Sequence, residues 1–208
     1  MSLKTIQSVL ESLKSGYMKP TPPPALTPTP PPTATPDAIS YFNKGENYRH
    51  AENWVMAIGE YTRAIGVNPN YTVAYFYRGY SYDELGQYQN AISDYTKAIQ
   101  LDPDDASAYN NRGYSYDELG QHQTAINDYT KAIQLDPDDA NAYGNRGNSY
   151  DDLGQYQQAI LDLNTAIQLD PDNAWAHYIR AFVYRNLGQT ANANADDAMA
   201  CFLDSYYC

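Results

Sequence analysis

Small and aromatic residues recur along this chain at helical spacing, in two short runs separated by a glycine. In residues 105–138, Gly120 follows the first run and Pro137 follows the second. The residues in this spacing are Ala106, Tyr109, Gly113 and Tyr116, and then Ala125, Tyr129 and Ala132. Residues three and four positions apart share one face of a helix, and glycine and proline mark its ends. The pattern therefore predicts two short antiparallel helices.

The same unit of 34 residues accounts for most of the chain. Its copies are residues 37–70, 71–104, 105–138, 139–172 and 173–208. The second and third copies match at 26 of 34 positions without a gap. The fifth is more divergent, with Ala181, Asp197 and Ser205 where the others have the glycine, an aromatic residue or leucine, and the proline. A fixed period of this length is typical of a solenoid, whose end units are relaxed because each lacks one neighbour.

The order of these positions resembles the tetratricopeptide repeat (TPR). In the third copy the matching residues are Tyr109, Gly113, Tyr116, Ala125, Tyr129, Ala132 and Pro137. The resemblance implies an all-α, right-handed superhelical solenoid of helix-turn-helix repeats that acts as a non-catalytic scaffold for protein–protein interaction. The chain departs from the family pattern where Leu is usual, at Arg78, Arg112, Arg146 and Arg180. We expect each arginine to lay its stem along the packing surface with its head in water.

The resemblance also implies a concave groove lined by the first helices of successive repeats, where a peptide or helix would bind. The groove candidates are Phe76, Tyr80, Asp83 and Glu84 in repeat two, Asn110, Tyr114, Asp117 and Glu118 in repeat three, Asn148, Asp151 and Asp152 in repeat four, and Trp175, Tyr178 and Phe182 in repeat five. Tyr80 and Tyr114 are the stronger contact candidates, because exposed aromatic residues favour interfaces. The acids fit either a row that attracts Lys and Arg or an ordinary solvated surface. The strip in repeat five is either a binding patch or covered by residues 202–207.

Residues 1–19 predict an amphipathic helix. Its apolar stripe consists of Leu3, Ile6, Leu10, Leu13 and Tyr17. A helix of this length does not hold its shape alone in water. Two interpretations remain: it frays or packs on its own repeats, or it docks in the groove of another copy, giving a ring or a filament.

Residues 20–36 contain nine Pro and five Thr. This composition predicts an extended linker with a reach on the order of 50 Å, because Pro-rich chains adopt about 3.1 Å per residue. It is also compatible with O-linked sugars on an extracellular or surface stalk, or with a ligand for aromatic grooves.

Charge narrows the classes of partner. The formal net charge is -12, and residues 1–36 contribute +2, which leaves -14 for residues 37–208. Nucleic acid is not expected, because phosphate binding needs a basic surface. The expected partners are basic or amphipathic peptides, or another copy of the chain. No apolar run approaches the roughly 18 residues of a membrane span, and residues 1–19 do not read as a secretory signal.

Catalysis and metal binding have little support in the sequence. His50, His122 and His177 are isolated from other candidate ligands or triad members. The DPDD sequences at 102–105 and 136–139 lack the ligand spacing of a calcium loop, and helix capping explains these aspartates better. We therefore expect no enzyme activity, no cofactor and no metal.

The two cysteines, Cys201 and Cys208, are seven residues apart. On a continuous helix they would lie about 10 Å apart along the axis, which is too far for a disulfide. We expect a buried Cys201 and a frayed Cys208, with a bridge between molecules as the alternative.

Overall fold

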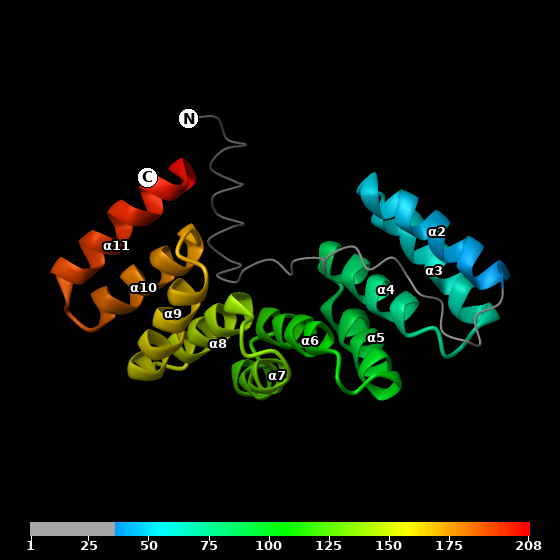
Figure 1. Cartoon of the computed structure of the whole chain (residues 1–208), viewed down its shortest axis with the longest axis horizontal. Helices are drawn as coiled ribbons and strands as arrows, with labels where there is room; N and C mark the ends of the chain where they lie inside the picture. Colours follow the sequence, from blue (N-terminus) through cyan, green and yellow to red (C-terminus); the bar gives the residue numbers. More distant parts are fainter. Residues whose placement is uncertain (1–35) are drawn as a thin grey trace. The chain divides into compact units, whose positions relative to one another are not determined.

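The computed structural model describes residues 36–208, which are helical almost throughout. These residues form ten α-helices and one short 3-10 helix, and they include no β-strand. They divide into two compact units, residues 36–119 and residues 120–208 (Figure 1). The all-α class predicted from the sequence is confirmed. The predicted N-terminal helix and the predicted linker up to residue 35 lie outside the described residues.

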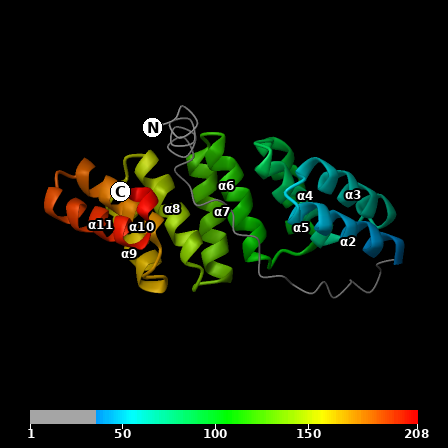
Figure 2. The ribbon, with the colours of Figure 1, turned by 90° about the horizontal axis from the view of Figure 1, so that it is seen from above.

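The first unit is built of helical hairpins. Its helices are α2 (Pro36–His50), α3 (Trp54–Val67), α4 (Thr72–Glu84), α5 (Tyr88–Leu101) and α6 (Ala106–Glu118). Helix α2 pairs with α3 and α4 pairs with α5, as Figures 1 and 2 show, while α3 packs on α4 and α5 on α6. Each second helix therefore contacts both its own partner and the first helix of the next repeat.

The second unit repeats this arrangement. Its helices are α7 (His122–Leu135), α8 (Ala140–Asp152), α9 (Tyr156–Leu169), α10 (Ala174–Asn186) and α11 (Thr190–Leu203), followed by the 3-10 helix η1 (Ser205–Tyr207). Helices α8 and α9 form one pair, and α10 and α11 form another. Between pairs, α7 packs on α8 and α9 packs on α10, and η1 lies against α11.

The two helices of a pair approach closely because a glycine faces a large side chain. A Cβ atom added at Gly79 would lie 3.0 Å from the ring of Tyr95, and one at Gly147 would lie 2.9 Å from the side chain of Leu163. Both Tyr95 and Leu163 are fully buried. In so tightly packed an interior, a larger residue at either glycine forces the helices apart.

The turn inside each pair needs a residue with left-handed backbone. Gly86 has a φ of 68° in the α4–α5 turn. At the equivalent position of the first repeat, Glu52 has a φ of 54°, and it is the one non-glycine residue with positive φ among residues 36–208. A Cβ atom makes this conformation unfavourable. The HAEN turn at residues 50–53 therefore differs from the later turns in sequence and carries a conformational cost that a glycine would avoid.

The arginines that replace Leu do not hold their heads in water, so that prediction is wrong. Arg78 on α4 donates from Nε and Nη2 to the two carboxylate oxygens of Asp94 on α5, at 2.7 Å each. Its Nη1 donates to Thr62 Oγ1 on α3 at 3.0 Å. Burial by itself would lower the pKa of Arg78, but the hydrogen bonds and charge of Asp94 outweigh burial and raise it. The guanidinium thus ties together three helices.

The second unit contains the same bridge twice. Arg146 donates to Asp162 at 2.7 and 2.9 Å and to Thr130 at 3.0 Å. Arg180 donates to Asp196 at 2.7 and 2.6 Å and to Asn164 at 2.6 Å. The prediction failed because it considered the arginine alone and not the carboxylate, 16 residues further on, that the paired helix presents to it.

The prediction for the cysteines is also wrong, because Cys201 and Cys208 form a disulfide. Helix α11 ends at Leu203 and η1 turns the chain back, which brings the two Cα atoms to 4.7 Å. This separation lies within the range that a disulfide spans. The prediction assumed that the helix continues to the end of the chain.

Substituting Asp94 should destabilise the fold. Asp94→Ala leaves the largely buried guanidinium of Arg78 without its carboxylate, so the free energy of unfolding should fall by about 2–4 kcal/mol. Urea denaturation measures this change. The double variant Arg78→Leu with Asp94→Ala should recover most of the loss, because it removes both charges. A loss no greater than that of Asp104→Ala, at an exposed aspartate, would contradict the role of the bridge.

Candidate functional site

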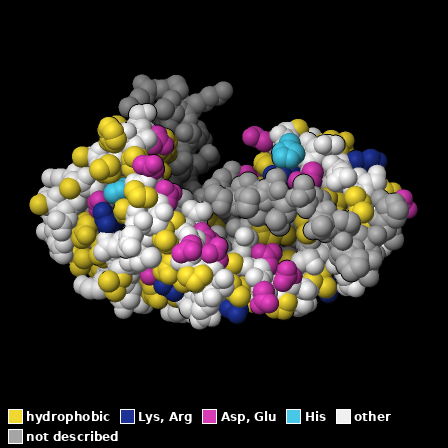
Figure 3. Space-filling model, in the orientation of Figure 1, with side chains coloured by type: hydrophobic (Ala, Val, Ile, Leu, Met, Phe, Trp, Pro, Cys, Tyr) yellow, Lys and Arg dark blue, Asp and Glu magenta, His cyan; other side chains and the backbone are white. Residues whose placement is uncertain are grey.

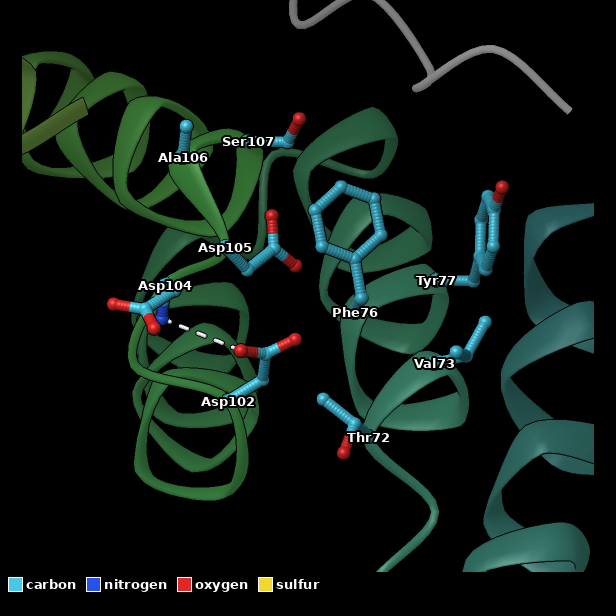
Figure 4. Close-up of a pocket in the computed structure, with 9 residues that line it drawn as sticks. All are labelled: Thr72, Val73, Phe76, Tyr77, Asp102, Asp104, Asp105, Ala106 and Ser107. Atoms are coloured by element: carbon cyan, nitrogen blue, oxygen red, sulfur yellow. Dashed lines mark hydrogen bonds between the residues drawn. The ribbon is translucent and has the colours of Figure 1, made fainter. Parts of the chain in front are cut away.

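A pocket of about 340 Å³ opens in the first unit, beside the N-terminal ends of α4 and α6 (Figure 4). We call it the α4–α6 pocket. It is lined by Thr72, Val73, Phe76 and Tyr77 of α4, by Asp102, Asp104 and Asp105 of the α5–α6 turn, and by Ala106 and Ser107 of α6. Of the predicted groove residues, Phe76 lies in this lining. The pocket and the predicted groove in this unit therefore share Phe76.

One side of the pocket is aromatic and the other is acidic. Figure 4 shows the ring of Phe76 between Asp105 and Tyr77. Asp105 caps α6 by accepting the backbone N–H of Ala108 at 3.1 Å, as the sequence predicted. Burial raises the pKa of Asp105, and the charge of Asp102 adds to this effect. Because Asp102 itself is exposed, the rim of the pocket carries negative charge beside an apolar wall.

Half of the 14 predicted groove residues are packed into the interior. The buried ones are Phe76, Tyr80, Asp83, Asn110, Tyr114, Asp117 and Asn148. The half-buried ones are Glu84, Glu118, Asp151, Trp175 and Tyr178, and the exposed ones are Asp152 and Phe182. A ligand would meet the half-buried and exposed side chains directly. It would reach the buried ones only where the surface opens, as it does beside Phe76.

Tyr80 and Tyr114, the two tyrosines expected to contact a ligand, pack against other aromatic rings inside the first unit. The ring of Tyr80 packs edge-on against Trp54, with 6.0 Å between centroids. The ring of Tyr114 packs in the same way against Tyr88, at 6.2 Å. Trp54 and Tyr88 each begin the second helix of the preceding pair. These aromatic pairs add to the packing of neighbouring repeats.

Asp83 is the most unusual of the predicted acids. Its two oxygens accept hydrogen bonds from the hydroxyls of Tyr95 on α5, at 2.8 Å, and Ser115 on α6, at 2.7 Å. Burial raises the pKa of Asp83 to about 8, against the effect of these hydrogen bonds, and the charges of Glu84 and Glu118 raise it further. Asp83 is therefore a structural link between three helices rather than a solvated surface charge.

The equivalent acid in the second unit has different neighbours. Asp151 accepts a hydrogen bond from Asn186 at 3.3 Å, and burial raises its pKa to about 6. Leu163 and Val183 stand where Tyr95 and Ser115 stand around Asp83. Neither side chain can donate a hydrogen bond to Asp151, which is half-buried.

The apolar strip of α10 is partly covered. Tyr178 packs against Tyr207 of η1, with 5.0 Å between ring centroids. Trp175 lies against the backbone of Gly144, where an added Cβ would lie 2.9 Å from its ring. Phe182 remains 47% exposed. Of the two interpretations given for this strip, covering by the C-terminal residues therefore applies to Tyr178 and not to Phe182.

Sequence reasoning missed the acidic side of the pocket. Helix capping and turn formation explain Asp102 and Asp104 in the sequence, and Asp102 does accept the backbone N–H of Asp104 in the turn, at 3.3 Å. The sequence did contain a signal for this acidic side. The DPDD sequence at 102–105 directly precedes α6, the first helix of repeat three, and Phe76 lies near the start of α4, the first helix of repeat two. Only repeat two combines this turn with aromatic residues at 76 and 77, since repeats three and four have Asn110, Asn111, Gly144 and Asn145 there.

Within residues 36–208 there is no group of three or more His, Cys, Asp or Glu side chains placed to hold a metal ion. None of the helices in this part of the chain is long and apolar enough to cross a membrane. On the face shown in Figure 3, acidic side chains are more frequent than Lys and Arg.

The repeated helical hairpins, in which a glycine of one helix faces a large side chain of the other, define this protein as a helical-repeat solenoid. Sequence models of the TPR repeat match residues 79–120 and 147–188, and models of the tetratricopeptide repeat match residues 106–139 and 128–161. The chain belongs to the tetratricopeptide-repeat family. Proteins of this family bind other proteins and are generally non-catalytic scaffolds.

Solved structures agree with this assignment. A MamA protein is 25% identical with a TM-score of 0.72, covering 81% of this chain and 92% of that one. MamA 41-end from Desulfovibrio magneticus RS-1 is 21% identical with a TM-score of 0.77, covering 84% and 98%. YrrB, described as a TPR protein with an unusual peptide-binding site, is 21% identical with a TM-score of 0.67, covering 81% and 87%. These likenesses confirm the TPR-like solenoid class. Among curated proteins, none matches the chain.

Replacing Asp83 should remove a pH dependence of stability. The pKa of Asp83 is about 8 in the folded chain against an ordinary value of 3.8. Between about pH 4 and pH 8 the folded chain therefore holds a proton that the unfolded chain has lost, and the free energy of unfolding falls as pH rises. The slope from this group is at most about 1.4 kcal/mol per pH unit.

Urea denaturation at pH 5 and pH 8 tests this expectation. Asp83→Asn should be less sensitive to pH than the unmodified chain, because the amide keeps a hydrogen-bond acceptor and does not titrate. Asp104→Asn, at an exposed aspartate, serves as the control. Equal pH dependence in the Asp83→Asn variant and the unmodified chain would contradict the assignment.

Proposed function

We propose that this chain is a non-catalytic scaffold that binds a basic or amphipathic peptide or helix along the first helices of its repeats. The observation that carries this proposal is the α4–α6 pocket. It lies at the predicted groove residue Phe76, and it joins an aromatic wall to an acidic rim. The acidic half is exposed at Asp102 and Asp104, and the buried ring of Phe76 forms part of the pocket wall.

The chemistry of the pocket favours a Lys or Arg side chain. The aliphatic stem of such a residue would lie along Val73 and Phe76. Its charged head would reach the carboxylates of Asp102 and Asp104. Aromatic faces attract cations, and carboxylates accept charge-assisted hydrogen bonds from them. The net charge of -14 on residues 37–208 would speed the encounter with a basic partner.

The other predicted groove residues extend this proposal beyond one pocket. Glu84, Glu118, Asp151 and Asp152 are at least partly exposed acids on first helices. Each follows an aromatic or amide residue one turn earlier, at Tyr80, Tyr114 or Asn148. YrrB, with its described peptide-binding site, is consistent with a peptide ligand, although the likeness itself extends only to the fold.

Removing the acidic rim should weaken peptide binding. Peptides selected from a random library on the full chain should be enriched in Lys or Arg. The double variant Asp102→Asn with Asp104→Asn should bind such a peptide about tenfold or more weakly, equivalent to about 1.4 kcal/mol, because charge-assisted contacts are lost. Fluorescence polarisation with the labelled peptide measures the affinity.

The next repeat supplies a matched control. Asp136→Asn with Asp138→Asn removes the same two charges from a turn with the same internal hydrogen bond, here 3.2 Å long. At the positions equivalent to Phe76 and Tyr77, the repeat that ends in this turn has Asn110 and Asn111. Equal loss of affinity in the two double variants would mean that net charge, and not the pocket, governs binding.

A second candidate function is self-assembly. The predicted helix of residues 1–19 combines the apolar residues Leu3, Ile6, Leu10 and Leu13 with three lysines. It thus has the character of the ligand proposed above, and the sequence predicts a linker between this helix and the repeats. We propose as the alternative that this helix docks in the solenoid of a neighbouring copy, a heterologous contact that gives a ring or a filament.

Light scattering over a concentration series tests the alternative. Residues 1–208 should form species that grow with concentration, whereas a chain beginning at Pro20 should remain monomeric, because the docking helix is missing. The full-length variant Leu3→Glu with Leu10→Glu keeps the length and should also remain monomeric. Monomers from the unmodified full-length chain would rule out self-assembly through this helix.

A further inference from the structure

The C-terminal turn lies over a predicted groove residue. After α11 the chain turns through η1, and the ring of Tyr207 packs against Tyr178 of α10, with centroids 5.0 Å apart. The neighbouring Tyr206 packs edge-on against Tyr207 at 5.2 Å. Burial raises the pKa of Tyr207, with smaller contributions from the charges of Asp204 and Tyr206. The phenol of Tyr207 is thus held against the helix.

The turn has few other contacts that fix it in place. None of its three residues is buried. Its hydrogen bonds are local, since Asp204 accepts the N–H groups of Tyr206, at 2.9 Å, and Tyr207, at 3.1 Å. Phe202 beside it is 83% exposed. A short segment without buried residues opens readily unless a covalent bond restrains it.

The disulfide supplies that restraint. It joins Cys201, in the last turn of α11, to Cys208, the residue directly after η1. The residues between the two cysteines must therefore form a closed loop that returns to α11. Because this loop includes Tyr207, the bond limits how far its ring can move from Tyr178.

We propose that the Cys201–Cys208 disulfide is a redox latch that keeps Tyr207 over Tyr178. Reduction releases the turn and uncovers the middle of the strip formed by Trp175, Tyr178 and Phe182. These three residues lie on one face of α10, three and four positions apart. With Tyr178 uncovered, the strip presents a continuous aromatic surface. That this surface then receives an apolar part of a ligand rests on the function proposed above.

The chemical step is thiol–disulfide exchange with a dithiol. One thiolate of the reductant attacks the sulfur of Cys208, forming a mixed disulfide and releasing Cys201 as a thiolate. The second thiolate of the reductant then displaces Cys208, so that the reductant leaves as a cyclic disulfide and both cysteines take up protons. Cys208 is exposed and Cys201 is half-buried, so the first attack is directed at an accessible sulfur.

Acetylation of tyrosine by N-acetylimidazole tests the latch on the full chain without any ligand. Tandem mass spectrometry reports each tyrosine separately, before and after reduction with a phosphine. We expect acetylation of Tyr178 to increase several-fold on reduction. Tyr184 is the internal control, because it lies on the same helix, is also half-buried and packs near Arg180 rather than η1. Its acetylation should not change.

Two variants separate the latch from a general effect on folding. Tyr207→Ala keeps the disulfide and should expose Tyr178 already in the oxidised chain. The double variant Cys201→Ser with Cys208→Ser should show high acetylation of Tyr178 that the phosphine does not alter. The proposal is overturned if Tyr178 reacts equally in the oxidised, reduced and Tyr207→Ala chains, or if Tyr184 rises together with Tyr178. Because no ligand is present, failure of the proposed peptide binding would leave this result unaffected.

Discussion

The close approach of two helices at a glycine is the constraint on which the first, second and fourth repeats depend. Where a Cβ of Gly79 would lie, the ring of Tyr95 fills the space. The same ring carries its hydroxyl to Asp83, which also accepts a hydrogen bond from Ser115 of the next repeat. One packing choice therefore sets the distance between α4 and α5 and positions the polar link to α6.

The acids of this chain fall into two groups that the net charge does not distinguish. Asp94, Asp162 and Asp196 pair with arginines of the same repeat and join its two helices. Asp102 and Asp104 remain exposed at the rim of the α4–α6 pocket. These two, and the partly exposed acids Glu84, Glu118, Asp151 and Asp152, are available to a basic ligand, whereas the paired acids are not. Fewer carboxylates can therefore bind a basic ligand than the formal charge suggests, and they lie at particular places on the surface.

The sequence was sufficient for the fold, because the 34-residue period and the glycine and proline positions determine the helices almost alone. It was insufficient wherever the outcome depends on a partner from another helix. The heads of Arg78 and its equivalents find carboxylates 16 residues away, and the last helix ends early enough for Cys208 to reach Cys201. Phe76 is the predicted groove residue that lies in the lining of the α4–α6 pocket. The adjoining aspartates were not predicted there, because helix capping and turn formation already explained them.

The central claim, that first helices receive a peptide, is tested most directly by hydrogen exchange of the full chain with and without a selected peptide. The account predicts slower exchange at the N-terminal turns of α4 and α6, in residues 72–77 and 102–107, with little change in the middle of α5. Protection confined to the second helices α3, α5, α7, α9 and α11, or no protection at saturating peptide, would contradict it.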